Sequence, residues 1–238
     1  MKPETTWNNY WKEYELDTAF DPAAKIVFDE LSSLVGDFKG KTLLECGSGT
    51  GKISAMVAQN RGATHLLDYS SRALEFSRLF FNAHKLNGVF VEGSIFSIPY
   101  PDNSFDVVWN SGVLEHFPEE KQIAALSEMR RVCRAGGMII AFNPFSKAYI
   151  YRIGKYFAEK CDLWPFGDEF PVSTLNGISS RAGLTLEKEY SFGYQLQFSF
   201  LKYYPIPGFC QHIIRRIFDR CIFKSVFNGY LLTSIFIK

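Results

Sequence analysis

The 238-residue chain has the length and composition of one globular unit with room for appended segments. Hydrophobic residues make up 47% and charged residues 21%, which excludes a disordered chain. The net charge of +1 gives no electrostatic reason to expect a nucleic acid as partner. The five cysteines include no CxxC pair, so we expect neither a disulfide framework nor a metal site. With no secretory signal at the start, we expect a cytoplasmic protein.

The first 35 residues are predicted to be helical. Apolar residues follow helical spacing from Trp7 to Val35, and Pro22 divides this region into two helices. Trp7, Tyr10 and Trp11 form an aromatic stripe in the first helix. Such a stripe packs against a core or covers a ligand, and both interpretations stay open.

From Lys41 onward, short strands alternate with helices. The strands are predicted at 42–46, 65–68, 89–92, 105–110 and 138–142, and the helices at 52–59, 71–85 and 118–134. The last of these helices has acids in its first turn, arginines up to Arg134 in its last turn, and Gly136-Gly137 as its predicted end. This alternation predicts βαβ units with right-handed crossovers and a parallel sheet.

The pattern weakens after Asn143. Helices are predicted at 149–160 and 173–181, and a strand at 184–191. The run from Ser225 to Ile237 is shorter than the roughly 18–20 residues of a spanning helix, so no transmembrane segment is predicted. The stretch from Ser191 to Lys238 contains six Lys or Arg residues, one acid, Asp219, and many aromatic residues. This basic, aromatic tail packs on the core, lines a pocket for a ligand that the protein acts on, or lies on an anionic membrane surface, and all three interpretations stay open.

A glycine-rich turn between the first predicted strand and helix is the most informative segment. It reads Glu45-Cys46-Gly47-Ser48-Gly49-Thr50-Gly51-Lys52. A triphosphate-binding loop needs glycine where Cys46 stands and Ser or Thr where Ile53 stands. A dinucleotide fingerprint needs a glycine where Lys52 stands. The pattern that fits is an acid followed by three glycines at alternate positions.

Four motifs in order carry a family resemblance. They are the segment from Glu45 to Gly51, Asp68 at the end of the second strand, residues 98–117 around the fourth strand, and residues 128–144 around the fifth. Together, over roughly residues 40–145, they resemble the class I S-adenosylmethionine-dependent methyltransferases. The resemblance is closest to the small-molecule group, which includes enzymes that act on quinone precursors. It implies a Rossmann-like, doubly wound α/β fold with a mainly parallel seven-stranded sheet and helices on both faces.

The resemblance also implies a cofactor site for S-adenosylmethionine. Asp68 would accept from both ribose hydroxyls, Glu45 would favour the cationic amino-acid end, and Ile95 would offer an apolar face to the adenine. Ser94 stands where the family often has an acid for the adenine amine, which implies a weaker contact there. The implied site comprises Tyr10, Trp11, Glu45, Gly47, Ser48, Gly49, Asp68, Tyr69, Ser94, Ile95 and Asn110.

Glu115 and His116 come after the fourth strand on the expected acceptor side and are the candidate catalytic residues. A histidine titrates near neutrality and can remove a proton from an acceptor, although His116 at this place can also simply close the helix start. Asn143-Pro144-Phe145 is similar to a motif of enzymes that methylate nucleic-acid bases. That motif comes after the fourth strand and this one after the fifth, so base methylation is not expected.

We therefore expect a methyltransferase that uses S-adenosylmethionine on a small or lipid-like acceptor, with oxygen, nitrogen and carbon all open as the methylated atom. The alternatives are an inactive module that binds the cofactor and a nicotinamide-dependent oxidoreductase. The predicted division is a helical cap over residues 1–36, a core over 37–200 with an acceptor-side insertion near 146–183, and an extension over 201–238 packed on the core.

Overall fold

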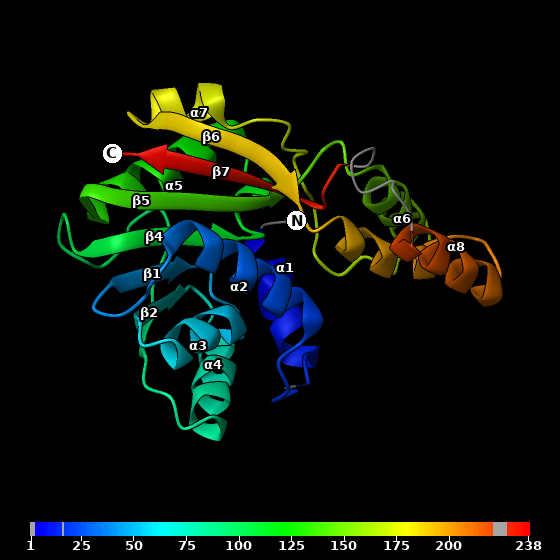
Figure 1. Cartoon of the computed structure of the whole chain (residues 1–238), viewed down its shortest axis with the longest axis horizontal. Coiled ribbons are helices and arrows are strands. Elements are labelled where there is room, and N and C mark those ends of the chain that lie inside the picture. Colours follow the sequence, from blue (N-terminus) through cyan, green and yellow to red (C-terminus); the bar gives the residue numbers. More distant parts are fainter. Residues whose placement is uncertain (1–2, 16, 221–227) are drawn as a thin grey trace.

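The computed structural model describes residues 3–15, 17–220 and 228–238 (Figure 1). In chain order the elements are α1 (Pro3–Glu13), α2 (Pro22–Val35), β1 (Thr42–Cys46), α3 (Lys52–Gln59), β2 (Ala63–Asp68), α4 (Ser71–Ala83), β3 (Val89–Glu92), β4 (Phe105–Ser111), the 3-10 turn η1 (Leu114–His116), α5 (Glu119–Val132), β5 (Cys133–Pro144), α6 (Tyr149–Lys160), α7 (Asn176–Arg181), β6 (Thr185–Phe192), the 3-10 segment η2 (Tyr194–Tyr203), α8 (Gly208–Arg220) and β7 (Leu231–Ile237). The predicted split of the N-terminal region at Pro22 is confirmed, because Pro22 occupies the first turn of α2 and Asp21 caps it.

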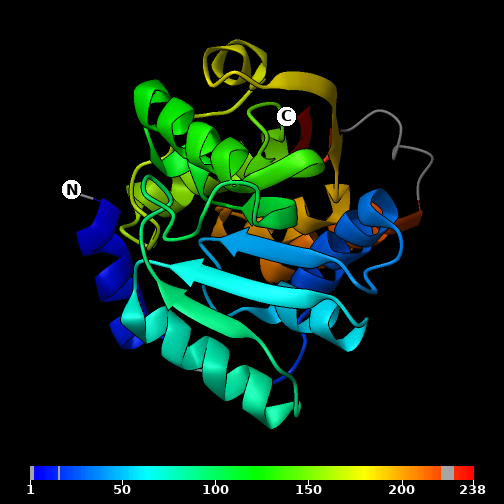
Figure 2. The same cartoon turned by 90° about the vertical axis from the view of Figure 1, so that its left-hand side faces the viewer.

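Seven strands form one sheet in the order β3-β2-β1-β4-β5-β7-β6 (Figures 1 and 2). β1 to β5 are parallel, and β7 runs antiparallel to both β5 and β6. The predicted α/β class with a mainly parallel seven-stranded sheet is confirmed. Because the parallel strands share one direction, the ends of β1 and β2, which carry Glu45 and Asp68, open on the same edge.

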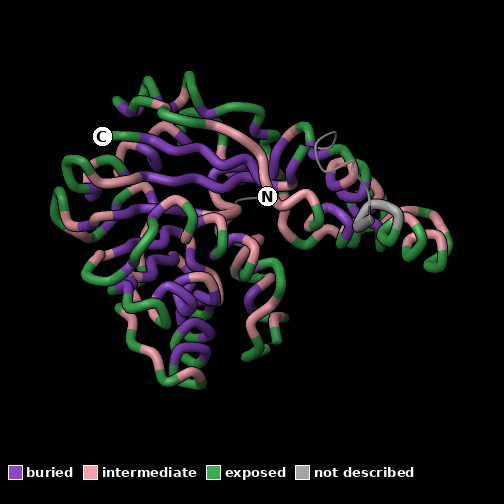
Figure 3. Tube along the Cα trace, in the orientation of Figure 1, coloured by how far each residue is buried: buried purple, intermediate pink, exposed green. Residues whose placement is uncertain are grey.

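Both faces of the sheet are covered, because consecutive residues of the central strands are buried on opposite sides. Leu43 and Val107 pack with α2 and α3, whereas their neighbours Leu44 and Val108 pack with α5. Figure 3 shows the central strands buried along most of their length. Such two-sided burial is what distinguishes a doubly wound sheet from a half-exposed one.

The border between α5 and β5 differs from the prediction. The helix was expected to continue to Arg134 and to stop at Gly136-Gly137, but it ends at Val132 and β5 begins at Cys133. Cys133 pairs with Phe105, and the register shifts before Val107 pairs with Met138. The two glycines therefore lie in an irregular entry to the strand rather than at a helix end. α7 is likewise shorter than predicted and starts at Asn176.

The last strand is the main feature that the sequence patterns did not predict. β7 lies between β5 and β6, although its residues fall in the segment assigned to an extension packed on the core. Thr233 pairs with Phe142 on one side and with Tyr190 on the other. A boundary at residue 200 therefore does not separate the core from the C-terminal segment, because the sheet uses strands from both sides of it.

α6, η2 and α8 project beyond the sheet as an arm (Figure 1). η2 packs against α6 and α8. Among the described residues, no helix combines the length and the apolar character needed to cross a membrane. Leu16, Cys221 and Lys224, which belonged to the predicted helical region and the basic tail, lie outside the described residues.

Candidate functional site

The turn between β1 and α3 is held tightly against its neighbours. Gly47 and Gly51 have φ angles of 76° and 67°, in the left-handed region that favours glycine. A Cβ on Gly47 would lie 2.6 Å from Val113 Cγ2, and one on Gly51 would lie 2.5 Å from Leu66 Cδ2. The Gly47 N–H donates to the Leu67 carbonyl at 2.7 Å. Glycine is therefore required for the turn to run this close to the strand ends.

Glu45 lies one residue before the end of β1 and is buried. Ser54 Oγ of α3 donates to Glu45 Oε2 at 2.5 Å. Burial raises the pKa of Glu45 to about 8; the hydrogen bonds from Ser54 oppose the shift, and the nearby Asp68 adds to it. At neutral pH most of this carboxyl is protonated, and a cation beside it would favour ionisation.

Asp68 ends β2 and holds the glycine turn in place. Its Oδ2 accepts from the Gly49 N–H at 2.9 Å, and its Oδ1 accepts from the Ser70 N–H at 2.9 Å. Burial raises the pKa of Asp68, and these backbone hydrogen bonds oppose the shift. The second acid is thus brought beside the turn, as the motif predicts.

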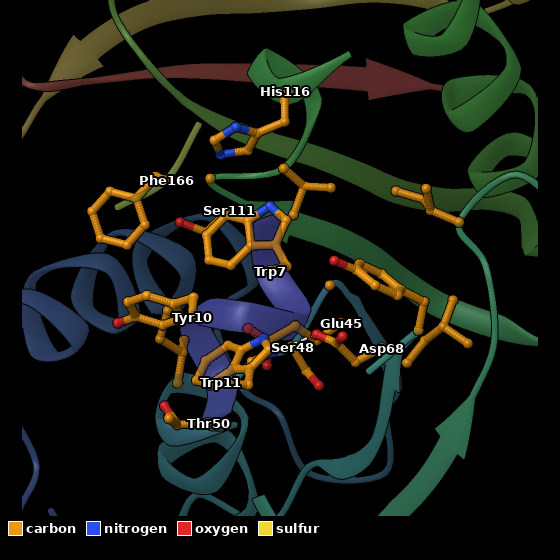
Figure 4. A pocket seen from close by; sticks show the side chains of 18 of the residues that line it. Trp7, Tyr10, Trp11, Glu45, Ser48, Thr50, Asp68, Ser111, His116 and Phe166 are labelled. Atoms are coloured by element: carbon orange, nitrogen blue, oxygen red, sulfur yellow. Dashed lines mark hydrogen bonds between the residues drawn. The ribbon is translucent and has the colours of Figure 1, made fainter. Parts of the chain in front are cut away.

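A cavity of about 320 Å³, the first cavity, lies over these strand ends (Figure 4). This volume lies within the range of small-molecule sites. The predicted cofactor and catalytic residues that line it are Tyr10, Trp11, Glu45, Gly47, Ser48, Gly49, Asp68, Tyr69, Ile95 and His116. Ser48 Oγ is buried and has no hydrogen-bond partner among the described residues. The cavity therefore combines an orphaned hydroxyl with two acids at neighbouring strand ends.

Two of the predicted cofactor residues are not among those that line this cavity. Ser94 Oγ accepts from the Phe96 N–H at 3.2 Å, within its own turn. Asn110 is fully buried and donates from Nδ2 to Met129 Sδ at 3.4 Å, which directs its side chain toward α5. Gly93, immediately before Ser94, does line the cavity. The backbone of this turn thus reaches the cavity where the predicted hydroxyl does not.

The helix α1 covers the first cavity with aromatic rings (Figure 4). Trp11 is buried, and its ring would contact a Cβ on Gly49 at 3.3 Å. Trp7 and Tyr10 pack against Phe166 with tilted rings, and the ring centroids lie 5.6 and 5.2 Å from that of Phe166. Sequence reasoning missed Phe166, and the Trp-Pro-Phe segment around it was the only local signal. The aromatic stripe therefore covers the cavity in this structure.

A second cavity of about 350 Å³ shares part of its wall with the first. The two have in common Trp7, Glu45, Ser48, Thr50, Ile53, Ser111, Gly112, His116 and Phe166. Beyond this shared wall, the second cavity is lined by two buried acids, Glu115 and Glu169, by the rings of Trp164, Phe200 and Tyr230, by the ion pair of Asp21 and Lys52, and by aliphatic side chains such as Val27 and Leu196. It is thus a chamber with mixed aromatic and aliphatic walls and two buried acids of its own, and it adjoins the first cavity.

The two acids of the second cavity are buried and shifted toward the neutral form. Burial raises the pKa of Glu115 well above its usual value, and the charge of Glu169 adds to this shift. Glu115 Oε2 has no hydrogen-bond partner among the described residues. Glu169 accepts from the Tyr151 hydroxyl and from Arg152 Nη1 at 3.4 Å, and burial raises its pKa too. A ligand hydroxyl, which can both donate and accept, would satisfy the open oxygen of Glu115.

His116 lies on the wall that the cavities share. Its Nδ1 donates to the Asp168 carbonyl at 3.1 Å, so the proton of the neutral ring sits on Nδ1 and Nε2 keeps a free lone pair. Nε2 lies 3.7 Å from Glu115 Oε1. Burial lowers the pKa of His116; the Asp168 carbonyl opposes this and Lys155 adds to it. The neutral ring is therefore the dominant form at pH 7 and is equipped to accept a proton.

The residues of the first cavity fit S-adenosylmethionine. Buried acids at two strand ends suit a ribose diol and a cationic amino-acid end, and the orphaned hydroxyl of Ser48 offers a further polar contact. Lys52, which breaks the dinucleotide fingerprint, is buried and pairs with Asp21 at 3.3 Å. No cluster of three or more potential metal ligands occurs among the residues that the structure describes.

Comparisons with known proteins identify the family of this chain. A family model described as methyltransferase domain matches residues 44–141. The chain is similar to the ubiquinone/menaquinone biosynthesis C-methyltransferase UbiE of Hahella chejuensis, with 30% identity covering 64% of this chain and 70% of that protein. It is also similar to 2-methyl-6-phytyl-1,4-hydroquinone methyltransferase 1, chloroplastic, of Oryza sativa subsp. japonica, with 28% identity over 68% of this chain. That match spans 44% of the rice protein, less than half of its length.

The fold of this chain is also similar to that of solved structures. A S-adenosylmethionine-dependent methyltransferase from Aquifex aeolicus matches with a TM-score of 0.60 over 100% of both chains, at 13% identity. The seven-stranded sheet thus has the fold of a methyltransferase. The chain belongs to the class I S-adenosylmethionine-dependent methyltransferase family. It is a small-molecule methyltransferase, and the oxidoreductase alternative is not favoured.

Proposed function

We propose that this methyltransferase acts on an aromatic acceptor that carries hydroxyl groups and an apolar tail, as a quinol does. The observation that carries the proposal is the second cavity, which is walled by aromatic rings, contains buried acids and adjoins the first cavity. A flat ring fits between aromatic walls, where faces and edges attract one another. Its hydroxyl groups, which can both donate and accept, would pair with the open oxygen of Glu115.

The walls of the second cavity define where such a ring would lie. The rings of Trp164 and Phe200 have centroids 6.3 Å apart, and those of Phe200 and Tyr230 have centroids 5.4 Å apart. Phe166 continues this wall to Trp7 at the border of the first cavity. A ring held along this wall would present one edge to the cofactor and one to Glu115 and His116.

His116 and Glu115 would handle the acceptor proton. A hydroxyl beside His116 Nε2 donates to its free lone pair and transfers its proton there as the acceptor becomes nucleophilic. The positive charge that forms on the ring would favour ionisation of the Glu115 carboxyl, whose Oε1 lies 3.7 Å from Nε2, and the carboxylate would then stabilise the imidazolium.

In the first cavity, Asp68 would hold the ribose hydroxyls and Glu45 the cationic amino-acid end of the cofactor. When bound, S-adenosylmethionine supplies a methyl group whose bond to sulfur breaks as the bond to the acceptor forms. The enzyme's part is largely to align the two reactants and keep water out, which α1 and Phe166 would do by covering the site. Methylation of oxygen or of a ring carbon releases one proton in either case, so the same base serves both.

The names of the relatives support the acceptor class. The rice relative is named for a phytyl hydroquinone and the Hahella relative for ubiquinone and menaquinone, all of them ring compounds with long apolar tails. An acceptor of this kind would place its ring in the second cavity and extend its tail outward from it.

An acceptor panel with methyl-labelled cofactor tests the proposal. The probes are a hydroquinone with a short prenyl tail, its dimethyl ether and a prenylated aniline of similar size. We expect label on the hydroquinone alone, and NMR of the product then locates the methyl on oxygen or carbon. Transfer to the dimethyl ether would contradict the role of the hydroxyl. Transfer to the aniline alone would replace the quinol with an amine acceptor, which buried acids and aromatic walls also suit.

A further inference from the structure

The helix α8 and the neighbouring η2 lie on the projecting arm (Figure 1). A groove of about 270 Å³ lies between them, and none of its lining residues lines either cavity. Three basic or titratable side chains line it: Lys202 from η2, and His212 and Arg215 from α8. Ser199 and Gln211 add neutral hydrogen-bonding groups, and none of the described residues lining the groove is acidic. Such a lining suits an anion with several oxygens, such as a phosphate.

The neighbouring face of α8 is apolar and open. Phe209 is 68% exposed and Ile213 is 50% exposed, and their spacing of four residues places them on one face of the helix. Arg216 lies one turn later on that face and is exposed. Large apolar side chains exposed side by side mark a contact surface more often than isolated ones do.

The charges of η2 and α8 indicate which kind of partner this surface would bind. From the start of η2 to the end of α8, residues 194–220 contain four Lys or Arg residues and a single acid, Asp219. A helix with apolar side chains on one face and basic ones beside them lies in the interface of an anionic bilayer, with the apolar groups below the headgroups and the cations among the phosphates. A nucleic acid would use the cations but would leave Phe209 and Ile213 without a role.

We propose that the η2–α8 surface docks on a bilayer that contains anionic phospholipids. Phe209 and Ile213 enter the headgroup boundary, and the groove of Lys202, His212 and Arg215 receives a lipid phosphate. Phe200, two residues before Lys202, lines the second cavity. Docking would therefore bring the proposed acceptor site near the membrane surface, although the docking itself does not depend on the identity of the acceptor.

Co-sedimentation of the full chain with vesicles tests this proposal. We expect binding to phosphatidylcholine vesicles that contain phosphatidylglycerol, little binding to pure phosphatidylcholine, and a loss of binding at high salt. The double variant K202E/R215E should bind at least about 25-fold more weakly, since one basic residue near an anionic surface contributes about fivefold. F209S/I213S should lose binding comparably. Equal binding of wild type and both variants would overturn the proposal.

Matched controls separate docking from general effects. Leu79 on α4 is 47% exposed and Lys39 is exposed, and both lie outside the arm. L79S and K39E should bind vesicles like wild type, and all variants should bind S-adenosylhomocysteine equally, which shows that they are folded. Competition by inorganic phosphate at concentrations too low to screen charge would reassign the groove to free phosphate. A shift of single-stranded RNA that F209S/I213S does not weaken would reassign the surface to nucleic acid.

Discussion

The two adjoining cavities differ in how far apart in the sequence their lining residues lie. The first takes its polar groups mainly from residues 45–69, where one turn and two strand ends lie close together in sequence. Beyond the shared wall, the second takes its buried acids from η1 and from Glu169, and its rings from Trp164, η2 and the residue before β7. Local backbone geometry positions the first set, and long-range packing positions the second. The two halves should therefore be separable by substitution, with cofactor binding changing in one half and turnover in the other.

The largest effect on cofactor binding is expected from substitution of Asp68. Asp68→Ala removes a charged acceptor for two ribose hydroxyls and frees the Gly49 N–H that it now holds. Hydrogen bonds to charged groups contribute about 1.5–3 kcal/mol each, so the affinity for S-adenosylhomocysteine should fall by at least about 100-fold in calorimetry. The affinity of Asp68→Asn, which keeps one acceptor oxygen, should lie between those of wild type and Asp68→Ala. If Asp68→Ala bound as tightly as wild type, the assignment of the first cavity would be wrong.

Substitution of His116 is expected to have the opposite effect, a loss of turnover with cofactor binding nearly unchanged. Because its ring is neutral and Nδ1 is held by Asp168, His116→Gln should lower kcat by roughly 100-fold while S-adenosylhomocysteine affinity changes by about twofold or less. Burial lowers the pKa of His116, so wild-type kcat/KM should fall only as the pH drops below about 6.5, when the ring becomes protonated. The variant should lack this acidic limb. A variant that retains both the rate and the limb would exclude His116 as the base.

The same contrast explains what the sequence predicted. The strand ends, the glycine turn and Asp68 follow from patterns of a few residues, and the structure places them together. Asn110 shows the limit, since its position at a strand end was predictable but its rotation toward Met129 depends on α5. β7 shows it again, because an apolar run becomes a central strand only when β5 and β6 already flank it. The second cavity depends on long-range contacts of this kind, so beyond the wall that it shares with the first cavity only Glu115 was predicted as a site residue.

A smaller effect is expected from the titration of Glu45. Its pKa of about 8 leaves it mostly protonated at pH 7, and the cationic end of the cofactor should drive ionisation. Binding should then release close to one proton at pH 7, and affinity should rise by almost tenfold from pH 6 to 7. Calorimetry in two buffers with different ionisation enthalpies measures the release. Glu45→Gln should bind more weakly and release no proton; proton release that persists in this variant would assign it to another group.

The finest test compares two tyrosines of the arm. The Tyr151 hydroxyl donates to Glu169 in the second cavity, whereas the Tyr204 hydroxyl donates to the Ile150 carbonyl at 2.9 Å and lines neither cavity. Each Phe variant loses one hydrogen bond, so each should lower the free energy of unfolding by about 1 kcal/mol in urea denaturation.

Only Tyr151→Phe should also change catalysis, because it leaves Glu169 with one donor fewer and raises the pKa of that carboxyl further. We expect its acceptor KM to rise severalfold, with S-adenosylhomocysteine affinity unchanged. Tyr204→Phe should keep both values at the wild-type level. If the two variants changed KM alike, the effect would come from loosening of the arm, and Glu169 would have no part in holding the acceptor. A change in cofactor affinity with Tyr151→Phe would instead show that the two cavities are coupled through their shared wall.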